Sequence, residues 1–232
     1  MIVHRKASER GNTRLSWLDG RHSFSFNRYQ DPKWMGFRTL RVINDDVVAP
    51  SGGFGTHSRQ DMEIVTWVLD GVLKHRDSTG SEGEIRPGDA QRMSAGTGIY
   101  HSEFNASTEK PVRLLQIWIE PSEQGTAPVY EQKEFPEAHR CNRLVVIASE
   151  DGRDGSVTIG QDAVIYNGIL DCAASVEHPL AAGRSAWVQV AKGAVSVNGL
   201  ALEEGDGAAL SQESAVRILA AEPSEVLVFD LN

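Results

Sequence analysis

The sequence has few cysteines and no long apolar run, and each absence removes a class of protein. Only Cys141 and Cys172 occur among 232 residues. Their positions match neither a metal-binding nor a redox spacing, so we expect free thiols and no disulfide framework. No stretch approaches the roughly 18 consecutive apolar residues of a membrane-spanning helix, and no apolar signal core follows Met1. We therefore expect a cytoplasmic protein with no membrane partner.

Positive charge is also scarce. The chain has 23 lysines and arginines against 32 aspartates and glutamates, a formal net charge of −9. Such a surface repels phosphate backbones, so nucleic acid is not an expected direct partner. The remaining composition, with 40% hydrophobic residues and 22 glycines, is typical of a globular protein with many tight turns.

Short strand-like segments separated by turn signals predict an all-β protein. Residues 37–46 (FRTLRVINDD) alternate between apolar and polar residues up to a predicted turn at 44–46, where the two aspartates are expected to be solvated. Residues 62–69 (MEIVTWVL) are rich in β-branched and aromatic residues and end at the hairpin dipeptide Asp70-Gly71. Short strands at close, regular spacing are typical of a sandwich or barrel.

A polar segment divides the chain into two similar halves. Residues 121–140 contain three prolines and have the composition of a linker. A tryptophan followed by a glycine and then a Gly-Asp pair occurs on both sides of it, starting at Trp67 and at Trp187. The pattern predicts two β-barrel domains, 1–125 and 126–232. The second lacks a histidine and glutamate pair at the corresponding positions, so we expect any chemistry in the first.

Two pairs of side chains stand two residues apart in Gly-rich, strand-like segments: His57 with Arg59, and His101 with Glu103. Residues two apart on a strand point to the same face, so adjacent strands carrying such pairs would direct their side chains into one pocket. Three of the four residues are metal-ligand types. Arg59 is not, because a guanidinium keeps its proton and has no lone pair to donate.

These segments resemble the two-part signature of cupin barrels. The matching segments are GGFGTHSRQDME at 52–63, PGD at 87–89 and HSEFN at 101–105. Further motifs cover most of the chain: WLD at 17–19, HSFSF at 22–26, MGF at 35–37, LRVINDD at 40–46, DMEI at 61–64 and MSAGTGI at 93–99. Together they resemble the pirin family of bicupins, which includes bacterial quercetin 2,3-dioxygenases. The resemblance implies two tandem, jelly-roll-like cupin barrels.

The resemblance also implies a metal site in the N-terminal barrel. Pirins hold one divalent metal ion, usually Fe(II), through three histidines and one glutamate. On this sequence, those positions are His57, residue 59, His101 and Glu103. Because Arg59 stands where the family has its second histidine, the implied ligands are reduced to two histidines and one carboxylate, a set that still suits non-haem Fe(II).

Arg59 leaves several arrangements open. The three remaining ligands could hold the metal despite the nearby positive charge. Arg59 could instead replace the metal by pairing with Glu103. In a third arrangement, Arg59 turns to solvent and Glu63 becomes a ligand. Finally, Arg59 beside an open metal position could stabilise a substrate oxyanion, which would change specificity without abolishing the site.

The leading functional hypothesis is a metal-dependent flavonol 2,3-dioxygenase. The resemblance implies a small aromatic, flavonol-like substrate that is opened by dioxygen with loss of carbon monoxide. Glu103 is the carboxylate at the mapped site that could also act as a catalytic base, although a ligand and a base compete for one lone pair. The alternatives are a non-enzymatic redox- or ligand-sensing protein with a regulatory protein partner, and a metal-free binding module. Whether the protein is an enzyme is left open at this point.

The other histidines and aromatic residues have simpler interpretations. His22 and His75 lie in strand-like stretches and are expected to have packing or surface roles. Trp118, like Trp67 and Trp187, is expected in the core. Phe26, with Phe24 and Trp34, belongs to an N-terminal segment that could form an aromatic wall over a barrel mouth.

Overall fold

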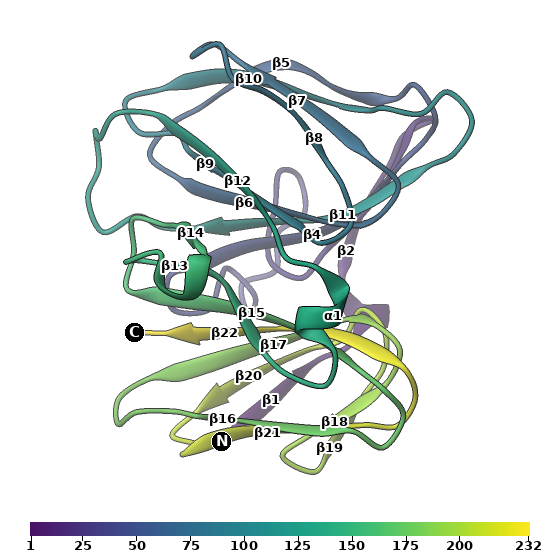
Figure 1. Ribbon diagram of the computed structural model, residues 1–232, viewed down its shortest axis with the longest axis vertical. Coiled ribbons are helices and arrows are strands. Elements are labelled where there is room, and N and C mark those ends of the chain that lie inside the picture. Colours follow the sequence, from purple (N-terminus) through teal and green to yellow (C-terminus); the bar gives the residue numbers. More distant parts are fainter.

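Four β-sheets stacked in layers make up the protein (Figure 1). The computed structural model describes residues 1–232, and its one α-helix is the single turn α1 (Glu137–Arg140). Two short 3-10 segments, Ala7–Glu9 and Arg153–Gly155, complete the helical structure. The all-β prediction is therefore confirmed.

The first half of the molecule consists of a seven-stranded sheet facing a four-stranded one. In spatial order, the large sheet contains β12 (Val129–Glu134), β9 (Asp89–Ser94), β6 (Glu63–Asp70), β11 (Val112–Ile119), β4 (Leu40–Val48), β3 (Leu18–His22) and β2 (Gly11–Arg14). The small sheet contains β5 (Gly53–Arg59), β10 (Ile99–Asn105), β7 (Leu73–Asp77) and β8 (Glu82–Ile85). All of these pairings are antiparallel. The two sheets face each other, and one face of each lines the barrel interior.

The second half repeats this arrangement of seven and four strands. Its large sheet contains β1 (Ile2–Arg5), β20 (Gly207–Ser211), β17 (Ser185–Lys192), β22 (Ser224–Leu231), β15 (Ala163–Leu170), β13 (Val145–Ser149) and β14 (Val157–Thr158). Its small sheet contains β16 (Ser175–Pro179), β21 (Ala215–Ala220), β18 (Val195–Val197) and β19 (Leu200–Leu202). The two halves are the tandem barrels that the sequence repeat predicted.

The largest apolar core lies between the two halves. Their large sheets form the two middle layers of the stack, as Figure 1 shows, and bury a cluster of 23 apolar residues between them. Trp67 of β6 and Trp187 of β17 are both fully buried in this cluster, as predicted. Phe24 packs on Trp187 with ring centroids 4.7 Å apart, so the N-terminal loop is anchored to the second half. The barrels are thus held together by apolar burial as well as by the linker.

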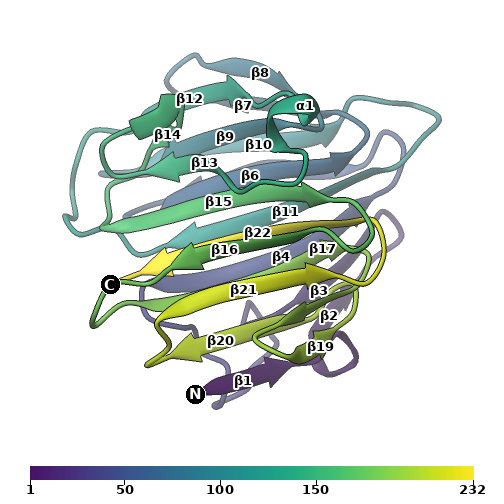
Figure 2. The same cartoon turned by 60° about the horizontal axis from the view of Figure 1, so that its bottom comes forward.

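The halves also exchange strands. β1, at the start of the chain, pairs with β20 of the second half, and β12 pairs with β9 of the first (Figure 2). Division of the chain into 1–125 and 126–232 stays a prediction. Each barrel contains one strand from the segment that forms the other barrel: β1 from 1–125 and β12 from 126–232. Separating the segments would therefore expose an unpaired edge on β9 and on β20.

Strand β4 differs from its prediction. It continues through Val48 instead of turning at 44–46, and both aspartates are buried. Asp45 accepts hydrogen bonds from Arg113 Nε and Nη2 at 2.9 and 3.0 Å, and Arg113 also reaches Glu204 of the second half at 2.7 Å. The prediction of a solvated turn was wrong because the strand continues through both aspartates, and the pairing with Arg113 of the neighbouring strand β11 satisfies the buried charge of Asp45.

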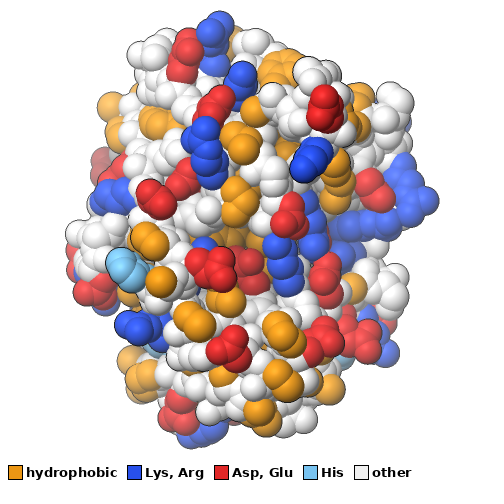
Figure 3. All heavy atoms as spheres, turned by 45° about the vertical axis from the view of Figure 1, so that its right-hand side comes forward, with side chains coloured by type: hydrophobic (Ala, Val, Ile, Leu, Met, Phe, Trp, Pro, Cys, Tyr) orange, Lys and Arg blue, Asp and Glu red, His pale blue; other side chains and the backbone are white.

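The surface carries mixed charges. Acidic, basic and apolar side chains are interspersed on the face shown in Figure 3. No helix in the structure has the length and apolar character needed to cross a membrane.

Candidate metal centre

The two predicted pairs of residues meet on neighbouring strands of the small sheet. In the antiparallel pairing of β10 with β5, His101 lies opposite His57, and their rings are 4.3 Å apart between centroids. Along β10, residues alternate between buried and more exposed, which turns His101 and Glu103 into the barrel. The register places Arg59 opposite Ile99, so Arg59 lies two residues farther along the strand pair from Glu103 than His57 does. The predicted neighbourhood of the two strands is thus present, and the assignment of a metal site to these residues stays a prediction.

His101 has the properties of a metal ligand. Both of its ring nitrogens are buried and neither has a hydrogen-bond partner. This costs free energy, because an imidazole can both donate and accept a hydrogen bond. Burial lowers the pKa of His101 to about 3, and the charges of the neighbouring histidines and Arg59 act in the same direction. A neutral imidazole with a free lone pair is the form that binds a metal ion. The residue therefore fits a divalent cation.

Glu103 is held in place from the opposite sheet. Gln116 Nε2 on β11 donates to Glu103 Oε2 at 2.8 Å, and Trp118 Nε1 donates to Gln116 Oε1 at 3.2 Å. This relay fixes the orientation of the carboxylate, as outer hydrogen bonds do for metal ligands. It also orients the Gln116 amide, because the indole can only donate.

The tautomer of His57 is fixed by its own strand. Its Nδ1 lies 2.8 Å from the carbonyl oxygen of Gly55. Since a carbonyl only accepts, Nδ1 carries the proton and Nε2 keeps its lone pair. His57 is half-buried at the rim of the pocket, so its free nitrogen is available to a metal ion.

His75 is a neighbour that sequence reasoning assigned to packing. It lies opposite Glu103 on β7, and ligand atoms of His75, His101 and Glu103 lie within 4.8 Å of one another. Its Nε2 is 3.0 Å from Asp77 Oδ2, whereas its buried Nδ1 has no partner. A carboxylate on one nitrogen with the other nitrogen free is the arrangement of many metal-bound histidines. The spacing of His75 and Asp77, two residues apart on a strand, was the available signal.

Arg59 adopts neither of the two alternative positions considered above. It forms no ion pair with Glu103 or any other carboxylate, and it is half-buried instead of turned to solvent. Its guanidinium carbon lies 4.7 Å from the centre of the Trp118 ring, and Nη1 donates to the Ser58 carbonyl at 3.2 Å. Burial lowers the pKa of Arg59, while the charge of Glu103 acts in the opposite direction. Trp118, expected in the core, is a half-buried platform for this cation.

Glu63 lies on the wrong face of β6 to replace a ligand. It alternates with Ile64, which belongs to the apolar interior of the first half, and therefore points toward the second half. There it accepts a hydrogen bond from Ser94 Oγ at 2.8 Å and lies close to Gly160. A rescue of the metal site by Glu63 is thus excluded by strand alternation.

A small cavity of about 220 Å³ opens beside the candidate ligands. His57, Glu103 and Arg59 line one part of it, and the N-terminal segment closes another with His22 and Phe26. The expectation that this segment supplies an aromatic wall is confirmed for Phe26. The histidine is held by two hydrogen bonds, from Nδ1 to Asn44 Oδ1 at 2.7 Å and between Nε2 and Thr13 Oγ1 at 2.8 Å, so its role is to shape the cavity.

Asp46 also lines this cavity, and sequence reasoning missed it. Burial raises the pKa of Asp46 to about 8, and the negative charges of Asp45 and Glu103 add to the effect. Its Oδ1 has no hydrogen-bond partner. This oxygen packs against Gly20, where a Cβ atom would come within 2.6 Å of it. Near neutral pH, the carboxyl group of Asp46 in this cavity is therefore mainly protonated.

Stability in the metal-free protein should reflect this raised pKa. The folded state keeps the Asp46 proton up to about pH 8, whereas the unfolded chain releases it near the ordinary aspartate pKa of 3.8. The stabilising contribution is thus complete below pH 4 and is lost as the pH rises toward 8. We expect Asp46→Asn to gain at least ~1 kcal/mol relative to the native protein between pH 5 and pH 8, measured by urea unfolding. A difference in unfolding free energy that does not change with pH would contradict the assignment.

Comparison with known proteins decides the family. A family model described as Pirin matches residues 3–119, and one described as Quercetinase C-terminal cupin domain matches residues 146–231. The chain belongs to the pirin family. It is 48% identical to quercetin 2,3-dioxygenase of Escherichia coli (strain K12) over 231 residues, which cover 100% of this chain and 99% of the relative. The predicted family membership is confirmed.

Solved structures support the same conclusion. This pirin matches the crystal structure of YhhW from Escherichia coli with a TM-score of 0.96 and 47% identity, covering 100% of this chain and 98% of the other. A second match is the bacterial pirin YhhW from the same organism in complex with nickel(II), with a TM-score of 0.95, 47% identity and coverage of 100% and 99%. The nickel complex and the histidine and glutamate cluster of this chain together make divalent metal binding plausible for this pirin.

Proposed function

We propose that this pirin binds one divalent metal ion, most simply Fe(II), through His57, His101 and Glu103, and acts as a flavonol (quercetin) 2,3-dioxygenase. The observation that carries the metal site is the pair of buried, unpartnered nitrogens of His101 directly beside Glu103. The substrate is supported by the relative of 48% identity whose name is quercetin 2,3-dioxygenase. His and carboxylate ligands are shared by several metals, so the donor set is compatible with iron and equally with nickel.

An ion held at these residues would supply Lewis-acid activation of the flavonol hydroxyl, which favours its deprotonation before dioxygen opens the ring with loss of carbon monoxide. Glu103 is the proposed base, and the hydrogen bond from Gln116 fixes the orientation of its carboxylate. Asp46 is a second carboxyl group lining the same cavity; because burial raises its pKa to about 8, it is a proton or hydrogen-bond donor there, and the role of base stays with Glu103. Phe26 and His22 close the cavity and exclude water from the reacting oxygens.

A metal-free binding module is the second candidate, and Arg59 favours it. The guanidinium lines the cavity beside Glu103 and keeps a fixed positive charge there. Such a charge opposes entry of a dication, since the cavity is partly shielded from water. This candidate predicts that the native chain is purified without metal.

The test is the metal content of protein prepared without chelator, measured by inductively coupled plasma mass spectrometry, together with release of carbon monoxide from quercetin in air. We expect about one equivalent of metal and turnover that stops after chelation. Metal without turnover would reject the dioxygenase and keep the metal site. An empty protein that neither binds added Fe(II), Ni(II) or Mn(II) nor becomes active with it would reject both and favour the binding module.

A further inference from the structure

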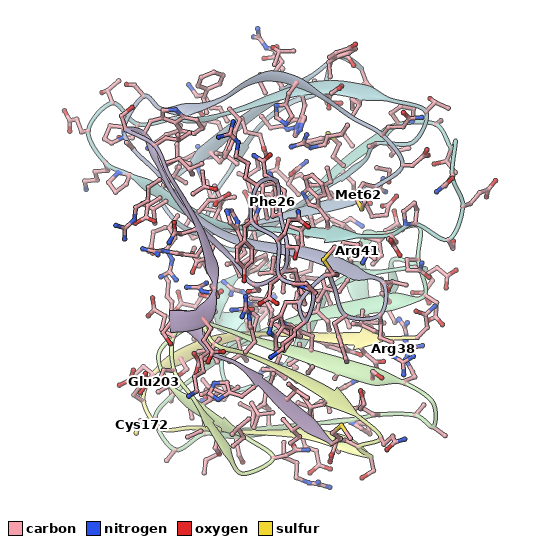
Figure 4. The ribbon with its side chains drawn as sticks, turned by 180° about the vertical axis from the view of Figure 1, so that it is seen from behind. Phe26, Arg38, Arg41, Met62, Cys172 and Glu203 are labelled. Atoms are coloured by element: carbon pink, nitrogen blue, oxygen red, sulfur yellow. The ribbon has the colours of Figure 1, made fainter.

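Arg59 lies where two hollows of the first barrel meet. The inner cavity of about 220 Å³ contains the candidate metal ligands. A second hollow of about 510 Å³ is open to the surface and is lined by Met35, Arg41, Met62 and Trp118, among others. Phe26, Asn27 and Arg59 line both. Phe26, Arg41 and Met62 are labelled in Figure 4 and lie on one side of the barrel, around the N-terminal loop.

The charge of Arg59 is not neutralised within the protein. Of the arginines that are not exposed, it is the one that forms no ion pair, and its buried Nε has no hydrogen-bond partner. Arg41, in the same outer hollow, is by contrast paired with Glu120 at 2.7 Å. A partly buried guanidinium with free donors is a site for an anion, because the unmade hydrogen bonds cost free energy until a ligand supplies them.

The surrounding side chains determine the rest of the ligand. Arg59 stacks on Trp118, and Phe26 meets the same indole edge-on with ring centroids 5.5 Å apart. Stacking holds the guanidinium plane and leaves its edge available for a carboxylate or another planar oxyanion. The methionines and aromatic rings of the outer hollow favour a flat apolar body. A single cation suits a single negative charge better than a phosphate.

Size indicates that one ligand occupies both hollows. The inner cavity is below the ~300 Å³ at which pockets usually enclose a drug-sized molecule. A ligand of two or three fused or linked rings would therefore extend past Phe26 and Arg59 into the outer hollow. Phe26 belongs to a loop and not to the barrel wall, so it can be displaced without breaking the sheet.

We propose that the two hollows form one binding site for a planar aromatic ligand that carries an anionic oxygen, and that Arg59 binds this oxygen. The proposal deepens the proposed function, since it assigns a charge to the ligand class of the same pocket. It does not depend on metal. Arg59 is here a specificity-determining residue that replaces a metal ligand of the family with an anion-binding group.

Two probes that differ in charge test the proposal. The affinities of 2-naphthoate and of its neutral analogue 2-naphthamide are measured by isothermal titration calorimetry on chelator-treated protein. We expect the native protein to prefer the carboxylate by about tenfold or more, as for a charge-assisted pair. Arg59→Gln should remove this preference by weakening naphthoate alone. Arg217→Gln, which changes an arginine of the second half that pairs with Glu177 and lines neither hollow, should leave the preference intact.

The outcomes separate this inference from the dioxygenase proposal. Equal affinities for the two probes, no binding of either probe, a preference that survives in Arg59→Gln, or a preference that disappears in Arg217→Gln would each overturn the role of Arg59. The comparison on the native protein gives a decision even if a variant does not fold. Because chelated protein is used, absence of metal or of quercetin turnover has no effect on the result.

Discussion

Replacement of His101 by alanine should abolish metal binding by this pirin. His101 is the central member of both triads that the structure offers, since it lies between His57 on one side and His75 on the other. Without it, each triad is reduced to Glu103 and one histidine, and two protein ligands are too few for a stable site. We expect the affinity for Ni(II) or Fe(II) to fall at least a hundredfold, measured by competition with a chromophoric chelator.

Two further variants identify the third ligand. If His57 is the ligand, as we propose, His57→Ala should weaken metal binding strongly and His75→Ala only modestly, by disturbing the packing beside His101. The reverse order would assign the site to His75, with Asp77 orienting its ring. His178→Ala is the matched control, because His178 pairs with Asp230 in the second half, far from the site in the fold. Retention of full affinity in His101→Ala would refute the ligand assignment.

Replacement of Arg59 by histidine should raise the affinity for a divalent metal ion by about tenfold or more. The change removes a fixed positive charge from the cavity and places an imidazole at a position where the sequence resemblance implies a metal ligand. It should also remove the preference for naphthoate over naphthamide, because the imidazole is not a permanent cation. The same chelator competition, carried out on native protein and variant side by side, measures the first effect.

Arg41→His is the control for this change, since it also exchanges an arginine of the outer hollow for histidine but lies away from the inner cavity. We expect no gain in metal affinity from it. An unchanged affinity in Arg59→His would show that stacking on Trp118 already keeps the guanidinium out of range of the ligands. The charge of Arg59 would then matter for ligands of the pocket alone.

Local sequence pattern was sufficient for much of the fold and for bringing together the residues of the candidate site. Alternation and turn signals predicted the strands, and the repeat around Trp67 and Trp187 predicted the two barrels. The spacing of His57 with Arg59 and of His101 with Glu103 placed their side chains on one face of each strand. The cross-strand register then brought His57 opposite His101 as expected.

Residues that depend on partners far away in the sequence were not predicted. Asp45 looked like part of a solvated turn, yet Arg113, 68 residues away, buries it as an ion pair. His75 looked like a packing residue, because nothing in its own segment shows that β7 lies beside β10. Glu63 was a reasonable ligand by spacing, and only the face of β6 on which it lies excludes it.

The sequence by itself determined the fold class, the family and the residues that meet in the first barrel. It did so because strand periodicity and motif spacing are local properties of the chain. Only the tertiary structure decided which strands are neighbours, and with them the burial of Asp46, the exchange of β1 and β12, and the position of Arg59 over Trp118. Sheet pairing joins residues that are far apart in the chain, so register and burial follow from the packed whole and not from any one segment.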